Sequence, residues 1–417
     1  MLATAELIAE ASQPARLAEL LPGYLGTAPL YRPAAARPFA QLPLITKQDI
    51  RRDFPANFLG PDANLENLIE REVLELEHTS GTSEERTPLL LPRGWWAEQE
   101  RRALCLNPIA AALLDSNPHA RRVTIASPVC SSDICYTSVP ARDDRIVGQS
   151  LFLSLSRFPF LWNDGDLARM AAETLEWQPQ FLDVDPVYGV VFARYCERHN
   201  IRLPSLKFVL CSYEFASVVH RRILDRVFGV PVIDLYGSTE TGHLLVEQTD
   251  GMRPSLETAF LEVLEPDAAG IGELVVTTLT NDLMPLIRYR IGDLVRRLEL
   301  PYRTRYVLHG RVADAFQTAA GRVTTRQVDQ CFKDLSGFAH YQLVQRNPGQ
   351  WLMRYVPDRE GPMPQQIEAV RQRLTSLLGV ASDLTIEQTD LLMPESSGKF
   401  RLGYPFSSPH TASHGEK

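Results

Sequence analysis

The segment Val230–Gly242, Val-Pro-Val-Ile-Asp-Leu-Tyr-Gly-Ser-Thr-Glu-Thr-Gly, changes character halfway along its length. Its first half is a short apolar run rich in β-branched residues, which is typical of a buried strand. Its second half is small, hydroxylated and flexible, and it carries one aromatic ring and one carboxylate. This combination favours a nucleotide-binding turn, although an ordinary polar turn after a strand is the simpler alternative.

Each residue type in the second half has a use in holding a nucleotide. Tyr236 can stack on a purine, and Gly237 lets the backbone approach the ligand closely. The hydroxyls of Ser238 and Thr239 can donate hydrogen bonds to phosphate. Glu240 can hold a hard cation such as Mg²⁺ against the same phosphates, because that ion prefers oxygen ligands.

Length and composition restrict the class of protein. The 417 residues exceed what one hydrophobic core usually supports, so two domains are expected. A net charge of −8 argues against a nucleic-acid partner, since such proteins present a basic face to the phosphate backbone. No apolar run reaches membrane-spanning length and Met1–Glu10 lacks a signal-peptide pattern, so we expect a cytoplasmic protein without a membrane partner.

A second polar loop follows an alternating segment earlier in the chain. Glu72–Glu77 alternates polar and apolar residues, as a strand with one wet face does. Five consecutive small residues come soon after it, namely Thr79, Ser80, Gly81, Thr82 and Ser83. Backbone N–H groups and hydroxyls in such a loop can surround an anion, but the Walker spacing is missing and a plain surface loop fits as well.

The most regular part of the chain predicts a strand–helix–strand unit. Leu206–Leu210 and Val230–Leu235 are the expected strands, and apolar residues at helical spacing fill 218–228. If the strands are parallel, Ser212–Glu214 and Tyr236–Glu240 lie at one sheet edge. Ligands bind at that carboxyl edge in open α/β sheets, which favours the nucleotide interpretation.

Two further features lie toward the C-terminus. Asp293 follows Gly292 at the end of an apolar stretch and can accept hydrogen bonds from ribose hydroxyls, while Arg288 or Arg290 could neutralise phosphate. The segment Pro394–Arg401 displays Lys399 on a Ser/Gly loop, within a small α+β region that begins near residue 311.

Four motifs in this order resemble the adenylate-forming superfamily of acyl-CoA synthetases, luciferases and peptide-synthetase adenylation domains. They are Thr79–Ser83, Tyr236–Glu240, Tyr289–Asp293 with Gly310-Arg311, and Gly398-Lys399. Within the superfamily, Asp234–Glu240 and Pro285–Arg290 are most similar to the phenylacetate-CoA ligase branch. The resemblance covers roughly residues 72–403.

The resemblance implies an α/β fold with a large multi-sheet N-terminal adenylation domain (1–309) and a small mobile α+β C-terminal domain (310–405). A tail over 406–417 is expected to be disordered. It also implies that a compact, aromatic carboxylic acid attacks ATP to give an acyl-adenylate, and that a thiol, most often coenzyme A, then displaces AMP. The cofactors would be ATP, Mg²⁺ and coenzyme A.

The resemblance also assigns roles to residues. Lys399 would bridge the attacking carboxylate and the charge that develops on phosphorus, and Thr239 and Glu240 would assist at the α-phosphate and the metal. The remaining nucleotide contacts would come from Thr79, Ser80, Gly81, Thr82, Ser83, Asp234, Tyr236, Gly237, Ser238, Arg290, Asp293 and Arg311. The acid would bind among Tyr136, Tyr188, Ser212, Tyr213 and Glu214.

Some positions depart from the family pattern and leave alternatives open. Glu84, Glu85 and Arg86 stand where a glycine and a proline are usual, and Ala313 replaces a charged hinge residue. The acceptor could instead be a carrier-protein thiol or an amine, AMP could be the group that is retained, and the chain could be a catalytically weak nucleotide-binding protein. A homodimer would be common for the branch.

Overall fold

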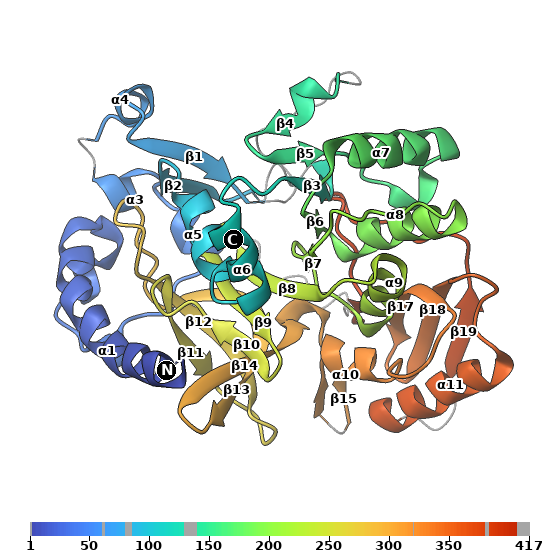
Figure 1. Ribbon diagram of the computed structural model, residues 1–417. Coiled ribbons are helices and arrows are strands. Elements are labelled where there is room, and N and C mark those ends of the chain that lie inside the picture. Colours follow the sequence, from blue (N-terminus) through green and yellow to red (C-terminus); the bar gives the residue numbers. More distant parts are fainter. Residues whose placement is uncertain are drawn as a thin grey trace. The chain divides into compact units, whose positions relative to one another are not determined.

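The computed structural model describes residues 2–60, 63–79, 86–128, 140–319, 321–379 and 383–406. They form two compact units. Figure 1 labels the helices and strands of both. Unit 1 contains Met1–Ala120 and Ile233–Leu308, and unit 2 contains Arg121–Val232 and His309–Lys417. The chain therefore contributes two separate segments to each unit, and the predicted domain boundaries after residues 309 and 405 remain predictions. The tail over 406–417 is predicted to be disordered, and all of it after Phe406 lies outside the described residues.

The sheet of unit 1 is antiparallel. Its strands follow the order β11-β12-β13-β14-β10-β9-β8. Their bounds are β8 Val232–Ser238, β9 Gly242–Gln248, β10 Gly251–Pro254, β11 Ala259–Leu264, β12 Ile271–Thr278, β13 Tyr289–Leu300 and β14 Arg303–Arg311. The sequence predicts an antiparallel pair from Phe260–Leu264 and Gly272–Thr278, which are joined by a Pro/Asp/Gly turn. The pair is confirmed as β11 and β12.

One long helix, several shorter helices and turns, and one hairpin complete unit 1. They are α1 Leu2–Thr27, the 3₁₀ turns η1 Pro29–Ala34 and η2 Phe39–Gln41, α2 Lys47–Arg51, α3 Ala56–Leu59, α4 Leu65–Glu70, β1 Leu74–His78, β2 Pro88–Pro92, α5 Trp95–Leu104 and α6 Pro108–Ser116. The sequence predicts one helix from Trp95 to about Leu114. This prediction is wrong, because α5 ends at Leu104 and a second helix, α6, begins at Pro108. Asn107 caps the new helix by accepting hydrogen bonds from the N–H groups of Ile109 and Ala110.

Unit 2 contains a mostly parallel sheet in the order β7-β6-β3-β5-β4. Its strands are β3 Arg122–Ile125, β4 Ile146–Val147, β5 Ser150–Phe152, β6 Phe181–Val184 and β7 Phe208–Cys211, with 3₁₀ turns η4 Asp143–Arg145 and η5 Pro159–Leu161. The helices α7 Asp164–Trp177, α8 Pro186–Arg198 and α9 Val218–Phe228 lie beside these strands (Figure 1). Val123, Leu182 and Val209 are fully buried in their core, and every residue of β6 and β7 is buried.

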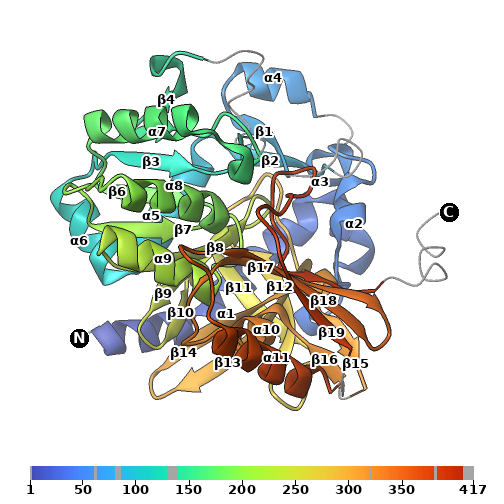
Figure 2. The same ribbon diagram turned by 90° about the vertical axis from the view of Figure 1, so that its right-hand side faces the viewer.

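The second sheet of unit 2 is built from the C-terminal region (Figure 2). Its order is β19-β18-β17-β20. Its elements are η6 Val312–Asp314, β15 Phe316–Thr318, β16 Gly321–Val323, α10 Thr325–Gln330, β17 Phe338–Asn347, β18 Gln350–Pro357, α11 Pro364–Leu378, β19 Leu384–Gln388 and β20 Gly403–Tyr404. The sequence predicts a hairpin in which Tyr341–Gln345 and Trp351–Val356 flank the turn Asn347–Gln350. It is confirmed as β17 and β18.

The mixed α/β fold with a large multi-stranded sheet is therefore as predicted. Within the described ranges, none of the helices combines the length and the apolar character needed to span a bilayer.

Candidate active site

The β8–β9 hairpin of unit 1 positions the stretch Tyr236–Glu240. Strand β8 continues past its expected end at Leu235, because Tyr236 and Ser238 pair with β9. The register shifts between Tyr236 and Gly237, where a Cβ atom would lie only 2.3 Å from the carbonyl oxygen of Gly242. The hairpin itself therefore requires the glycine at 237, and its contact with a nucleotide stays a prediction.

Two hydrogen bonds join this stretch to strand β13. The Tyr236 hydroxyl donates to Asp293 Oδ2 at 2.8 Å, and the Tyr289 hydroxyl donates to Glu240 Oε1 at 3.0 Å. Each bond runs from one motif to the other, so the stretches 236–240 and 289–293 lie side by side in unit 1. An adenine-stacking tyrosine, a ribose-binding aspartate and a metal-binding glutamate would need this arrangement.

Glu240 is a buried anion with an ammonium group beside it. The residue is 5% exposed, and its Oε1 atom lies 3.0 Å from Lys47 Nζ. Burial acts to raise the pKa of Glu240, but the Lys47 charge and hydrogen bonds from the backbone and Ser238 outweigh it, so the pKa is lowered. The carboxylate is therefore ionised near neutral pH.

An ionised carboxylate fits the Mg²⁺ that the sequence resemblance implies. Among the described residues, no group of three or more His, Cys, Asp or Glu side chains could hold a metal ion. Mg²⁺ commonly binds through one or two carboxylates together with substrate phosphates, so a lone Glu240 is compatible with that mode.

Lys47 is a functional candidate that the sequence interpretation missed. It is the first residue of α2, whose start is fixed by reciprocal hydrogen bonds between Thr46 and Asp49. Its neighbour Ile45 forms a β-bridge with Tyr289. A lysine at the positive end of a helix is electrostatically unfavourable, and this is the feature of the sequence that indicates an anionic partner elsewhere.

The predicted anion loop is closed at its base by two threonines. The Thr79 N–H donates to the Thr87 carbonyl at 3.0 Å, and the Thr87 N–H donates to Thr79 Oγ1 at 3.0 Å. Arg51 Nε donates to Thr87 Oγ1 at 3.1 Å. The remaining loop residues lie outside the described residues: Ser80, Gly81, Thr82, Ser83, Glu84 and Glu85.

Three of the other predicted nucleotide residues, Asp234, Ser238 and Arg290, have protein partners. The Asp234 N–H donates to Glu247 Oε2 at 2.8 Å, and the Ser238 and Thr241 hydroxyls are hydrogen-bonded at 3.0 Å. Thr239 lies in the turn between β8 and β9. Arg290 Nε donates to Glu273 Oε1 at 3.1 Å on the neighbouring strand β12, so a role in binding phosphate would require this pair to open.

Unit 2 gathers the residues predicted for the acid pocket at the ends of β6 and β7. Asp183 accepts hydrogen bonds from Ser212 Oγ at 2.6 Å and from the Tyr213 hydroxyl at 3.0 Å. Tyr213 has a φ angle of 73°, a left-handed conformation that is strained for a bulky residue. Its hydrogen bond to Asp183 holds it there. Tyr136, also predicted for this pocket, lies outside the described residues.

The loop that carries Lys399 is bound to the same part of unit 2. The Tyr188 hydroxyl lies 2.9 Å from the Gly398 carbonyl oxygen, to which it donates. Ser127 Oγ donates to the Ser397 carbonyl at 3.0 Å, and the Phe400 N–H donates to Glu214 Oε1 at 2.6 Å. Three of the predicted residues, Tyr188, Glu214 and Lys399, are thus brought together.

Two acids, the buried Asp185 and the partly buried Glu214, interact electrostatically with Lys399 in unit 2. Asp185 is 1% exposed and caps α8 by accepting from the Val187 N–H at 3.0 Å. Burial raises the pKa of Asp185 to about 7, against the opposing charge of Lys399. Burial and the charge of Asp185 raise the pKa of Glu214 well above its ordinary value, against Lys399, the Phe400 N–H and Arg311. The pattern Asp185-Pro186, a cap followed by proline, was the feature that could have revealed Asp185.

The raised pKa of Asp185 predicts how stability depends on pH. Between its ordinary value of 3.8 and about 7, the folded protein keeps a proton that the unfolded chain has lost. The free energy of unfolding should therefore fall as pH rises through this window. Asp185→Asn keeps the helix cap and removes this contribution, so the variant should lose less stability than the parent between pH 4 and pH 7 in urea titrations.

The neighbouring lysine supplies the control for this prediction. Because Lys399 lowers the pKa of Asp185, the Lys399→Ala variant should show the fall in stability continuing to higher pH. Equal pH dependence of the parent and Asp185→Asn would contradict the assignment.

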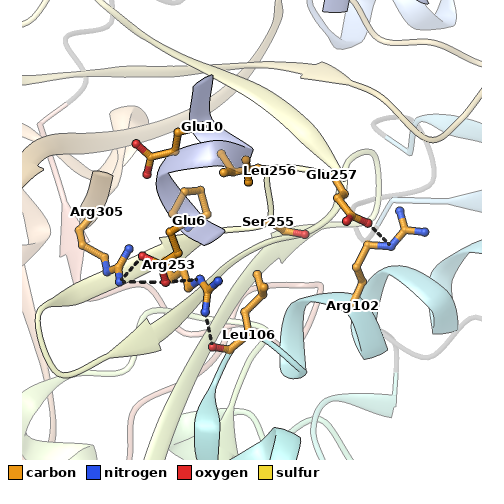
Figure 3. Close-up of a pocket in the computed structure, with 11 residues that line it drawn as sticks. Glu6, Glu10, Arg102, Leu106, Arg253, Ser255, Leu256, Glu257 and Arg305 are labelled. Atoms are coloured by element: carbon orange, nitrogen blue, oxygen red, sulfur yellow. Dashed lines mark hydrogen bonds and ion pairs between the residues drawn. The ribbon is translucent and has the colours of Figure 1, made fainter. Parts of the chain in front are cut away.

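A separate cavity of about 200 Å³ occurs in unit 1 (Figure 3). Its charged walls are paired internally: Glu6 accepts from Arg253 Nε at 2.9 Å and from Arg305 at 3.1 Å. Arg102 faces Glu257 at 3.6 Å. The residues that line it include none of the motif residues that the structure describes, so it is not the candidate active site.

No protein-family model matches the chain. Similar sequences include the phenylacetate-coenzyme A ligase of Escherichia coli strain K12, 27% identical over 264 residues, which are 56% of this chain and 60% of that enzyme. The enzyme of the same name from Aromatoleum evansii is 29% identical over 136 residues, 30% of this chain and 31% of that enzyme. The chain thus spans no more than three fifths of these curated relatives' length.

Solved structures share the fold. A 2-hydroxyisobutyryl-CoA ligase with its acyl-AMP in the postadenylation state matches with a TM-score of 0.67 and 17% identity, over 96% of this chain and 90% of that one. An anthranilate CoA ligase with anthranoyl-AMP matches with a TM-score of 0.55 and 14% identity, over 79% and 66%. At these identities the likeness establishes the fold alone.

Proposed function

Because this chain is a relative of the phenylacetate-CoA ligases within the adenylate-forming superfamily, we propose that it activates a small carboxylic acid with ATP and passes the acyl group to a thiol. In the first step a carboxylate oxygen bonds to the α-phosphorus and the bond to pyrophosphate breaks. In the second step a thiol sulfur attacks the acyl carbon, loses its proton and displaces AMP.

The observation that carries this proposal is the pair of hydrogen bonds between the two motifs of unit 1. The bonds from Tyr236 to Asp293 and from Tyr289 to Glu240 hold two aromatic rings and two carboxylates in one small region. We assign Tyr236 to the adenine and Asp293 to the ribose. A Mg²⁺ ion held by Glu240 would neutralise charge between the phosphates.

The residues of unit 2 supply the second part of the proposal. We assign Lys399 to the charge that develops between the carboxylate and the α-phosphate, an interaction that is strongest in the transition state. Its loop is held by Ser127, Tyr188 and Glu214. The ring of Tyr188 packs against Trp162 and Phe400, with centroids 5.5 and 6.2 Å away. These rings favour a compact, aromatic acid.

Acid-dependent exchange between ATP and labelled pyrophosphate tests this proposal. We expect exchange with at least one member of a panel of aryl and short alkyl acids, and none without acid. If the protein binds ATP but no acid supports exchange, a nucleotide-binding protein without ligase activity becomes the better interpretation.

The acceptor is identified once an active acid is known. Coenzyme A should convert the bound adenylate into a thioester with release of AMP. A carrier protein with a phosphopantetheine arm is the alternative thiol, and mass spectrometry of the acylated acceptor, with each acceptor supplied in turn, distinguishes them. A homodimer is proposed from the branch alone, and light scattering measures it directly.

A further inference from the structure

Helix α2 presents two cations on one face. Lys47 and Arg51 are four residues apart, a spacing that places side chains on the same side of a helix. Lys47 Nζ lies 3.0 Å from Glu240 Oε1. Arg51 Nε donates to Thr87 Oγ1 at 3.1 Å. One helix of unit 1 thus contacts both the candidate metal ligand and the base of the predicted anion loop.

The backbone of α2 is held firmly enough to position these charges. Ile50 is fully buried in the core of unit 1. The Asn57 side chain donates to the Ile50 carbonyl at 2.8 Å, and Thr46 and Asp49 cap the helix start. The position of the helix is therefore set by its own packing rather than by the Lys47–Glu240 pair.

The two side chains suit different tasks at a polyphosphate. Lysine is a point charge on a flexible stem with three donors, so it can exchange one anionic partner for another. The Lys47 side chain is 39% exposed and open to solvent. Arginine offers a planar fork that can bind phosphate oxygens while it keeps a second contact.

We propose that Lys47 and Arg51 bind the β- and γ-phosphates of ATP. Lys47 pairs with Glu240 before nucleotide binds, and it moves to a phosphate oxygen when the metal occupies the carboxylate. Arg51 acts from the base of the 79–87 loop. This inference rests on the proposed function and adds two residues to its phosphate site.

Direct binding measurements test the proposal without relying on activity. Lys47→Met and Arg51→Met are each expected to weaken Mg·ATP and Mg·pyrophosphate binding by about 10- to 100-fold, the usual worth of a charged hydrogen bond. AMP affinity should not change, because AMP lacks the β- and γ-phosphates. Arg52→Met is the matched control, since Arg52 is 68% exposed and pairs with Asp49.

Without a metal ion, substitutions of Glu240 and of Lys47 should change the affinity for ATP in opposite directions. In EDTA, Glu240→Gln releases Lys47 for phosphate and should tighten ATP binding, whereas Lys47→Met should weaken it. The double variant Lys47→Met/Glu240→Gln should not show the tighter ATP binding expected of Glu240→Gln. It also leaves no buried charge unpaired, so it remains informative if Lys47→Met alone does not fold.

The outcomes separate this inference from the proposed function. If the wild type supports exchange but the folded Lys47 and Arg51 variants bind ATP and pyrophosphate as tightly as Arg52→Met, the inference is overturned and the function stands. If the wild type binds no ATP, both are overturned.

Discussion

Replacing Lys399 by alanine is expected to slow acid-dependent ATP–pyrophosphate exchange by about 10²–10³-fold, the usual cost of removing one preorganised charged contact from a transition state. The Lys399 ammonium would stabilise negative charge that develops only as the carboxylate attacks the α-phosphorus. Its loss should therefore lower kcat for adenylation much more than it weakens ATP binding.

The second half-reaction provides the control for Lys399→Ala. In the proposed family mechanism the lysine leaves the site before thiol transfer. A synthetic acyl-adenylate should consequently be converted to the thioester by Lys399→Ala at close to the parental rate. Unchanged exchange with every active acid would contradict the assigned role.

Gly398→Ala is expected to disable adenylation nearly as strongly, although it leaves the lysine in place. Gly398 has a φ angle of 83°, and a Cβ atom there would lie 2.0 Å from Ser127 Oγ and 3.0 Å from the Tyr188 hydroxyl. The loop would have to move away from Ser127 and Tyr188, and Lys399 would be displaced with it. We expect the exchange rate to fall by roughly 10²-fold, toward that of the lysine variant.

Gly349→Ala is a matched control for backbone strain. Gly349 has a φ angle of 84° in the β17–β18 hairpin, but nothing lies within 4 Å of an added Cβ atom. Both variants pay the conformational cost of a left-handed alanine. Only Gly398→Ala should lose exchange activity. Equal losses in both variants would show that the contact of the Lys399 loop with Ser127 and Tyr188 is not required for adenylation.

Much of the local structure could be predicted from the sequence. A Pro/Asp/Gly turn between two strand-like segments indicated the β11–β12 pair, and the turn Asn347–Gln350 indicated the β17–β18 hairpin. The predicted end of β8 was too early, because its last residues are ordered by pairing with β9 rather than by their own apolar character. The motifs containing Glu240 and Asp293, which were expected to share a site, are joined by hydrogen bonds.

The residues that sequence reasoning missed depend on contacts between distant parts of the chain. Lys47 is an ordinary residue in a short helix until the fold brings it to Glu240. Asp185 resembles any helix cap until burial raises its pKa and the Lys399 loop packs nearby. One sequence contains local patterns and motifs, but it does not state which distant side chains will meet.

The central claim, that a carboxylate oxygen attacks the α-phosphate of ATP, is tested most directly with an acid whose carboxylate carries ¹⁸O. After complete turnover with the thiol acceptor, mass spectrometry of the products shows where the label has gone. Our account predicts one ¹⁸O atom in AMP and none in pyrophosphate. Label in inorganic phosphate, together with formation of ADP, would contradict it.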